Sequence, residues 1–437
     1  MPNARCRTGF SLSNFMSELG WKYLTEDDKN TILKGIRDGV AYGGPYHVEI
    51  HPADRCNIDC FFCSTAALRG TDEVPLTRLE EMIAELKACG TRAIRLSGGG
   101  EPLFHRKAKD FLRTIAASGI PIENLTTNAV LLSEEVADIL VDCCDQVTVS
   151  LNTGDAETYA SMMQTPARNF ERVLTNIRGL VAQRRKRRSA TPRVNLQFLV
   201  WRDNYKTIPK MYALARELGV DTILFNGLSF LRDDQKMSAE ETAEMLRLYE
   251  EVIRVDEYRR IASIESYEQD IRPALAGINA RLDAERRSRG PLRRLAHLVG
   301  RRDLTWREKL AHRRRVAQLR RIERGTAGLD EPCIIGWHSM LIRVSGVVAP
   351  CCILQGAPLG NVYQHSIRDI WMGEDFVRFR AELSRIIRAG DAWQPEPGAD
   401  RTVVAMCGGK GGEVCPIKSF YFKPDVDFMR RLTAAAR

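Results

Sequence analysis

The stretch "QVTVSLN", Gln146 to Asn152, decides the fold, because it reads as a strand whose two faces differ. Polar and apolar side chains alternate along it, with the period of two that is typical of a β-strand. Helical patterns lie on both sides of it, at 133–143 and 169–183. The stretch therefore predicts one strand in a chain that alternates strands with helices. The two alternating sets are Thr148, Ser150 and Asn152 against Val147, Val149 and Leu151.

The same alternation of short apolar runs and longer helical patterns extends from about Tyr46 to Gly227. Such an order predicts right-handed βαβ units and a parallel sheet. Six units are too few for a closed eight-stranded barrel, so an open or partial (βα)6 barrel of the α/β class is expected. The predicted strands are 46–50, 93–97, 123–128, 146–152, 194–200 and 222–228, and the predicted helices are 76–90, 107–118, 133–143, 169–183 and 207–219.

Several of these strands carry polar side chains on every second residue. A parallel sheet that is covered by helices on both faces should instead read as continuous apolar runs. We therefore expect the polar face to line a cavity that admits water and a ligand. An antiparallel sheet with one face in solvent is the alternative, and the intervening helices speak against it. The polar sets outside the opening stretch are His47, Glu49 and His51; Arg95 and Ser97; and Asn195 and Gln197.

Length and composition indicate an ordinary soluble protein of two or three domains. The chain has 437 residues, of which 44% are hydrophobic and 28% charged, and single cores stop growing at about 250–300 residues. No run of about 18 uncharged apolar residues occurs, at the first residues or elsewhere. We therefore expect a cytoplasmic protein without a membrane span.

The positive charge is concentrated in one segment. The net charge is +9, and residues 281–324 alone hold 16 Lys and Arg against 5 Asp and Glu. Leucines at helical spacing there predict one or two basic amphipathic helices, after a helix that begins with a capping box at Ser238 and Glu241. The basic face is interpreted as a solvated surface, a site for an anionic substrate or acidic peptide, or a nucleic-acid site. Trp306 is essentially its lone aromatic residue, so nucleic acid is the least favoured partner.

Three of the twelve cysteines lie within nine residues, in "RCNIDCFFC", Arg55 to Cys63. Cys56, Cys60 and Cys63 directly follow the first predicted strand, at the edge where open α/β sheets bind ligands. A reducing cytosol disfavours disulfides and leaves metal ligation as the leading interpretation. A structural zinc site and an iron–sulfur cube each take four ligands, so three thiolates leave one position open. Something other than protein must complete such a site.

The C-x3-C-x2-C spacing after the first strand of a (βα)6 domain resembles the radical S-adenosylmethionine (SAM) enzymes. The resemblance implies a [4Fe–4S] cluster on Cys56, Cys60 and Cys63, whose open iron binds the amino and carboxylate groups of SAM. It further implies reductive cleavage of SAM to a 5′-deoxyadenosyl radical. Phe62, which precedes the third cysteine, is expected to lie against the adenine.

The segment "SGGGEP", Ser97 to Pro102, resembles the GGE motif of the same family. The resemblance implies that the backbone of Gly99 and Gly100 and the carboxylate of Glu101 receive the SAM amino group. It also suggests further SAM contacts at the ends of the next strands. Each of these residues has a satisfied core polar group as its alternative. The further candidates are Asn128, Ser150 and Asn152 for SAM, and Asn195, Gln197 and Asn226 for SAM or substrate.

The last third of the chain holds a second group of cysteines. Cys333 and Cys351 flank a predicted hairpin with Gly346 in it, and Cys407 and Cys415 follow later. This order resembles the auxiliary-cluster extension SPASM, or its shorter relative twitch, and implies one auxiliary [4Fe–4S] cluster on these four cysteines. A structural zinc site is the alternative. Cys352 is interpreted as a substitute ligand, a packing residue or a thiol that donates a hydrogen atom.

The resemblance implies an oxidoreductase or epimerase that removes a hydrogen atom from a natural product such as an antibiotic sugar or cyclitol. Dehydrogenation or epimerisation would follow, and a flavodoxin or ferredoxin would be the reductant. The alternatives are maturation of a ribosomally made peptide and, in another class, a zinc protein that binds nucleic acid. The expected domains are an N-terminal helical segment (1–43), a radical SAM partial barrel (44–232), an Arg-rich connection (233–328) and the auxiliary-cluster domain (329–437).

Overall fold

The structure is a computed structural model of the 437-residue chain. It describes residues 21–63, 65–66, 69–227, 237–255, 262–265, 333–352, 354, 357–389 and 431. The predicted N-terminal helices correspond, in this part of the chain, to a short turn at Trp21–Tyr23 and to helix α1, Glu26–Asp38. Within the described residues, no helix combines the length and the apolar character needed to cross a membrane.

One curved sheet of ten strands organises the molecule, in the order β10-β9-β8-β1-β2-β3-β4-β5-β6-β7. All neighbours from β8 to β7 pair in parallel, and β8-β9-β10 pair antiparallel. The six predicted strands are confirmed as β1 to β6. The strands are β1 His47–Ile50, β2 Ala93–Leu96, β3 Ile122–Thr127, β4 Gln146–Ser150, β5 Arg193–Val200, β6 Thr222–Gly227, β7 Ala262–Glu265, β8 Ser339–Ile342, β9 Val347–Ala349 and β10 Gly360–Asn361.

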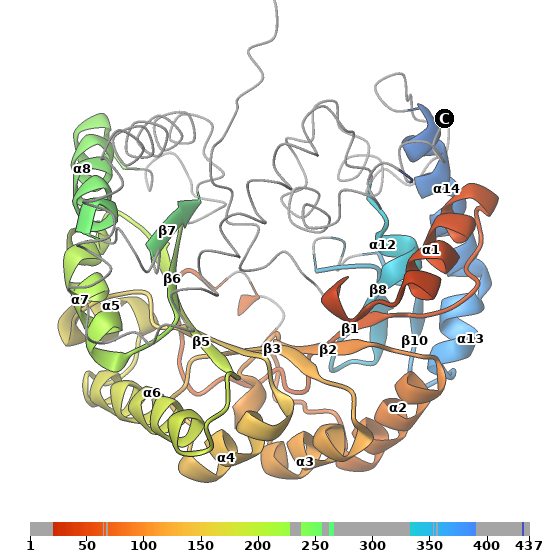
Figure 1. The fold of residues 1–437 in the computed structure, drawn as a ribbon, viewed down its shortest axis with the longest axis horizontal. Coiled ribbons are helices and arrows are strands. Elements are labelled where there is room, and N and C mark those ends of the chain that lie inside the picture. Colours follow the sequence, from red (N-terminus) through yellow and green to blue (C-terminus); the bar gives the residue numbers. More distant parts are fainter. Residues whose placement is uncertain are drawn as a thin grey trace, which may run out of the picture.

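Helices cover the outer, convex side of this sheet (Figure 1). The five predicted helices are confirmed as α2, α3, α4, α6 and α7, and the predicted capping box is present, since Ser238 and Glu241 exchange hydrogen bonds before α8. The short helix α5 was not predicted. The bounds are α2 Leu76–Ala88, α3 Ala108–Ser118, α4 Glu134–Cys143, α5 Ala156–Met163, α6 Arg168–Lys186, α7 Ile208–Leu218, α8 Ala239–Val255, α12 Ile335–His338, α13 Ile367–Met372 and α14 Glu374–Ala389.

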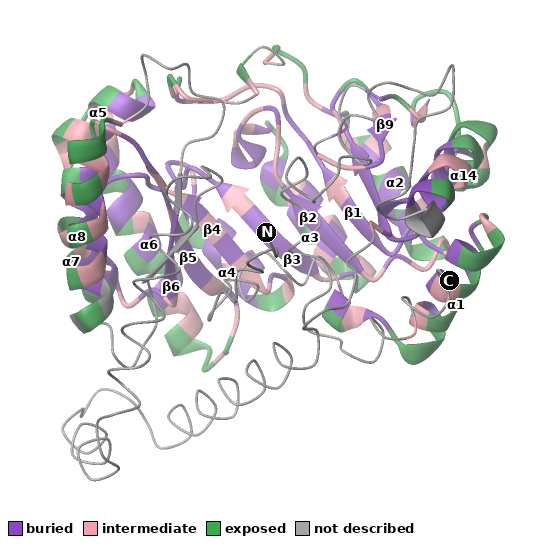
Figure 2. Cartoon of the chain, turned by 90° about the horizontal axis from the view of Figure 1, so that it is seen from above, coloured by how far each residue is buried: buried purple, intermediate pink, exposed green. Residues whose placement is uncertain are grey.

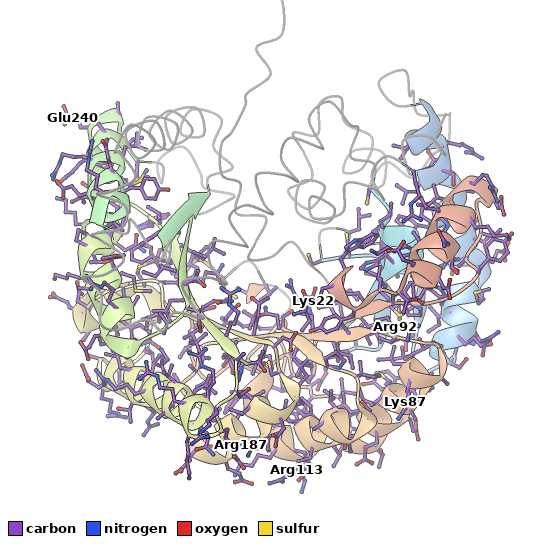
Figure 3. The ribbon with its side chains drawn as sticks, in the orientation of Figure 1. Lys22, Lys87, Arg92, Arg113, Arg187 and Glu240 are labelled. Atoms are coloured by element: carbon purple, nitrogen blue, oxygen red, sulfur yellow. The ribbon has the colours of Figure 1, made fainter. Side chains whose placement is uncertain are left out.

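The apolar core lies between the sheet and the outer helices. Figure 2 shows the strands as mostly buried and the outer helix surfaces as exposed. Charged residues such as Arg113 and Arg187 point away from the sheet (Figure 3), where they pair with Glu135 and Asp142. The inward helix faces and one face of the strands are fully buried against each other. The strand residues of this core include Val48, Ile50, Ile94, Leu96, Val147, Val149, Leu196 and Phe198.

The polar side chains of neighbouring strands lie together on the opposite, concave face, as the alternation predicts. Thr148 Oγ1 donates to Asn124 Oδ1 at 2.8 Å, and the hydroxyl of Ser97 donates to the carboxylate of Glu49. Because the helices beside these strands cover the other face, this face is the inner wall of an open barrel. The prediction of a parallel (βα)6 sheet with a polar inner face is confirmed.

The predicted C-terminal hairpin is formed by β8 and β9, which pair antiparallel around Gly346. Gly346 has a φ of +79°, a conformation that glycine adopts without strain. The hairpin extends the barrel sheet, because β8 pairs in parallel with β1 and Ile342 O accepts from His51 N at 2.9 Å. The second cysteine module is thereby attached directly to the strand that leads into the first.

Candidate active site

The loop after β1 carries Cys56, Cys60 and Cys63, all partly buried and without disulfides. Burial raises the pKa of Cys56, and burial with the neighbouring thiols raises the pKa of Cys60 to about 12. Ionised thiolates here therefore require a compensating positive centre. In the described residues, no three His, Cys, Asp or Glu side chains lie close enough together to hold one metal ion. A cube-shaped cluster does not need such a group, because it binds each thiolate to a different iron.

The glycine-rich loop after β2 is fixed against the cysteine loop. Gly100 N donates to Ala53 O at 3.0 Å, and Glu101 N donates to Arg55 O at 2.9 Å. A Cβ on Gly100 would lie 2.0 Å from Arg55 O, so only glycine fits. Thr65 Oγ1 also donates to Gly99 O at 2.9 Å. The two loops that sequence reasoning assigned to SAM are thus brought together by backbone contacts.

The carboxylate of Glu101 joins the glycine-rich loop to the end of β3. It is buried and accepts hydrogen bonds from Thr127 Oγ1 at 2.6 Å, Leu103 N at 3.1 Å and Asn128 N at 2.7 Å. Asn128 in turn donates from Nδ2 to Asn57 Oδ1 at 2.8 Å, inside the cysteine loop. Glu101 and Asn128 therefore lie at one junction, and their contacts with SAM stay a prediction.

Burial raises the pKa of Glu101 to about 7, although its hydrogen bonds favour the ionised form. The folded chain then holds this proton more tightly than the unfolded chain, so stability should fall as the pH rises from about 4.5 to 7. The total loss in the free energy of unfolding over this pH range is about 3 kcal/mol. We expect Glu101→Gln to remove the slope in urea unfolding of the cluster-free chain between pH 5 and 8, and the exposed Glu134→Gln to keep it. Equal slopes in all three proteins would contradict the assignment.

Ser150 and Asn152 lie at the end of β4 as predicted, but they are engaged differently. Ser150 is partly buried and donates to Gln197 Oε1 at 3.5 Å. Asn152 is fully buried in a left-handed conformation with φ of +63°, and its Oδ1 accepts from Leu199 N at 2.9 Å. Asn152 thus fixes the turn after β4, which agrees with the alternative of a satisfied core polar group. Its role in binding SAM stays a prediction.

Of the three further polar candidates, Asn195 and Gln197 on β5 are placed. Asn195 is fully buried and exchanges hydrogen bonds with Gln146 and Thr222 at 2.8 and 2.9 Å, as a satisfied core polar group does. Gln197 faces Ser150 on the inner wall. The side chain of Asn226 lies outside the described residues.

An aromatic cluster beside the cysteine loop was not predicted. The rings of Phe61 and Trp201 are 5.1 Å apart, those of Phe61 and Phe62 are 5.2 Å apart, and Met162 packs with them. Phe61 N and Asp59 N donate to the carbonyls at the end of α5, which hold the loop over the sheet. Phe62, the residue expected against adenine, therefore belongs to an apolar cluster with Phe61, Met162 and Trp201. Trp201 carries no motif that would have identified it.

The second group of cysteines is described in part. Cys333 precedes α12, and Cys351 and Cys352 follow β9; all three are partly buried. Cys407 and Cys415, predicted as the remaining ligands, lie outside the described residues, as does the basic segment 281–324. The assignment of an auxiliary cluster to these four cysteines, and the role of Cys352, stay predictions.

Two family models match this chain. The radical SAM superfamily matches residues 50–195, and SPASM, an iron–sulfur cluster-binding domain, matches residues 333–392. The chain carries a radical SAM domain and a SPASM domain. The first takes a [4Fe–4S] cluster and SAM, and the second takes auxiliary iron–sulfur clusters.

Curated relatives of this chain match it over part of their length. GTP 3′,8-cyclase of Rhodopirellula baltica is 33% identical over 136 residues, which are 30% of this chain and 37% of that protein. GTP 3′,8-cyclase of Chlorobaculum tepidum is 31% identical over 192 residues, which are 43% of this chain and 55% of that protein. The chain therefore spans about a third to about half of the length of these relatives.

Solved structures share the fold. SuiB of Streptococcus suis bound to S-adenosylmethionine aligns with a TM-score of 0.53 and 15% identity, over 82% of this chain and 72% of SuiB. The structure of SuiB bound to the precursor peptide SuiA also has a TM-score of 0.53, over 89% of this chain and 75% of SuiB. At this identity the likeness shows the fold alone.

The residues of the three-cysteine loop fit a [4Fe–4S] cluster. The three thiols lie close enough to act electrostatically on one another, and the Arg69 side chain interacts with the Cys63 thiol. Arg69 Nε is buried without a hydrogen-bond partner in the described part of the chain. A group with negatively charged sulfur would give this donor a partner. The glycine-rich loop packs backbone to backbone against this cysteine loop at Gly100, which keeps the two loops together.

Proposed function

We propose that this chain cleaves SAM reductively and dehydrogenates a small, polar natural product, such as a sugar or cyclitol, that is held on the inner wall of the barrel. When bound, the cofactors supply a 5′-deoxyadenosyl radical and an electron acceptor. The observation that carries the proposal is the polar inner wall beside the cysteine loop. The domain limits given above, and the reductant, form part of this proposal.

The inner wall next to both cofactor loops holds a charged group of side chains: Glu49, His51, Arg95 and Ser97. His51 Nε2 lies 3.2 Å from Glu49 Oε1, Ser97 donates to the same oxygen, and Arg95 interacts electrostatically with Glu49. Burial alone would raise the pKa of Glu49, but His51, Arg95 and Ser97 lower it to about 2. An ionised carboxylate therefore lies on the inner wall, where hydroxyl or ammonium groups of a substrate can bind it.

His51 is suited to take up a proton from the substrate. The carboxylate of Glu49 orients the imidazole by accepting from Nε2–H, which leaves Nδ1 as the basic nitrogen. Conversion of a secondary alcohol to a ketone removes a hydrogen atom from carbon, a proton from oxygen and one electron. His51 would take the proton, and the bound cofactors would supply the acceptors of the hydrogen atom and of the electron. A positioned base contributes about 10²–10⁴-fold.

We expect His51→Gln to lower product formation by about 100-fold while SAM cleavage stays within several-fold of the unmodified enzyme. The reason is that the amide still fills the site but cannot accept the proton. Liquid chromatography with mass spectrometry would quantify product and 5′-deoxyadenosine in the same sample. His365→Gln, at an exposed position after β10, is the control. An equal loss of product and of 5′-deoxyadenosine would contradict a role in proton uptake.

The substrate class is tested by anaerobic incubation of the reconstituted chain with SAM, dithionite and a panel of aminosugars, cyclitols, peptides and GTP in deuterated buffer. A product that is two mass units lighter and derives from a sugar or cyclitol supports the proposal. A solvent deuteron at carbon that is lost in Cys352→Ala would instead assign epimerisation with Cys352 as the hydrogen donor. Turnover of a peptide or of GTP alone would replace the proposal.

Modification of a ribosomally made peptide is the second candidate. Its support is the fold shared with SuiB, whose structure was solved with a precursor peptide. A peptide would also bind the ionised Glu49 and pack on Phe61, which is 42% exposed within the cysteine loop. The same panel distinguishes the two candidates, because a peptide substrate would gain a cross-link or a deuteron and the sugars would stay unchanged.

A further inference from the structure

Arg69 lies beside the three thiols that the radical SAM domain offers to its cluster. Its guanidinium interacts with the Cys63 thiol and is close enough to Cys56 and Cys60 to act electrostatically on both. The loop turns back to bring it there, since Arg69 N donates to Ala66 O at 3.2 Å and Nη1 donates to Ile58 O at 3.2 Å.

The charge of Arg69 is only weakly compensated. Its side chain is 19% exposed, whereas its partner Asp59, with Oδ1 at 2.6 Å from Nη1, is 76% exposed. Solvent screens a hydrated carboxylate, so Asp59 cancels only part of the guanidinium field inside the protein, and removing its charge strengthens that field. At Cys56 that field opposes the negative charges of Glu101 and Cys63.

We propose that Arg69 raises the reduction potential of the cluster on Cys56, Cys60 and Cys63, and so makes it reducible by a cellular electron donor. Reduction adds one negative charge to the cluster, and a nearby, partly buried cation stabilises that charge. Hydrogen bonds to the sulfur atoms, net charge and solvent exposure set such potentials. The buried Nε of Arg69, which has no hydrogen-bond partner among the described residues, would be an additional donor for cluster sulfur. The inference rests on cluster binding at these cysteines.

The test is an equilibrium redox titration of the full-length, reconstituted protein, followed by electron paramagnetic resonance. The relevant signal is the one that changes when SAM is added. At the midpoint potential of the unmodified protein, we expect Arg69→Gln to lower the ratio of reduced to oxidised cluster about tenfold, which is about 59 mV for one electron. Arg69→Lys, which keeps the charge, should shift it less. Asp59→Asn removes the opposing charge and should raise the ratio.

Measuring the iron content of each protein distinguishes failure of this inference from failure of the proposed function. If the unmodified chain binds iron but the ratio is unchanged in Arg69→Gln and Asp59→Asn, Arg69 is a structural brace and the proposal is overturned. A change in SAM affinity without a change in potential also overturns it. If Arg69→Gln loses its iron, Asp59→Asn decides alone: a raised ratio supports the proposal and an unchanged ratio overturns it.

Discussion

Replacement of Cys60 by alanine is expected to abolish SAM cleavage, lowering 5′-deoxyadenosine formation by roughly 100-fold or more. Each iron at a corner of the cube needs its own ligand, and the fourth corner is already reserved for SAM. Removal of Cys60 therefore leaves two protein ligands for four irons. Iron should fall by about four per chain, measured by elemental analysis, because the first cluster is lost.

Cys143→Ala is the matched control for this variant. Burial raises the pKa of both Cys60 and Cys143 to about 12, so both thiols hold their protons at neutral pH before any metal binds. Cys143 lies in α4, however, where its Sγ donates to Ile139 O at 3.3 Å, as a packing cysteine does. Its removal should leave iron and SAM cleavage unchanged. Retention of both by Cys60→Ala would refute the ligand assignment.

The barrel could be predicted from the sequence because its information is local. Each strand and helix shows its own period, and in "QVTVSLN" the alternation also identifies the inner face. The helix α5 escaped notice because eight residues give barely two turns, although Asp155 caps it by accepting from Thr158 N at 3.0 Å. A cap signal followed by a short apolar stretch would have revealed it.

The attachment of β8 to β1 could not be predicted. The strands β2 to β7 all lie between the two strands in sequence. The segment "SMLI" is a four-residue apolar run, and nothing in it indicates which strand it pairs with. Strand pairing depends on shape and on the remaining edges of the sheet, which exist only after the barrel has formed. This pairing places the SPASM hairpin beside the strand that leads to the cysteine loop.

The candidate site was predictable where spacing encodes chemistry, and not where contacts do. The cysteines and glycines follow a motif, whereas Trp201 contacts Phe61 from a distant part of the sequence. Asn195 shows the opposite limit: its position in an alternating strand suggested the cavity, but two side-chain partners satisfy it in the core. Periodicity identifies a face of a strand, but not whether neighbours already use its polar groups.

Gly100→Ala is expected to separate the two cofactor loops and to destabilise the protein by about 1–3 kcal/mol. The added Cβ would lie 2.0 Å from the Arg55 carbonyl oxygen, and the obstacle is backbone, which cannot rotate away as a side chain could. The hydrogen bonds from Gly100 N to Ala53 O and from Glu101 N to Arg55 O would be lost as the loops part. Thermal unfolding and 5′-deoxyadenosine formation measure the two effects.

Gly179→Ala provides the control, because the same methyl group would meet nothing within 4 Å inside α6. Alanine is favoured over glycine in a helix by about 0.8–1 kcal/mol, so this variant should be slightly stabilised and fully active. The two substitutions add the same atoms and differ only in what surrounds them. If Gly100→Ala kept the stability and SAM cleavage of the unmodified protein, the cysteine loop would not depend on the close approach of the glycine-rich loop, and cluster and SAM would have to be positioned by other contacts.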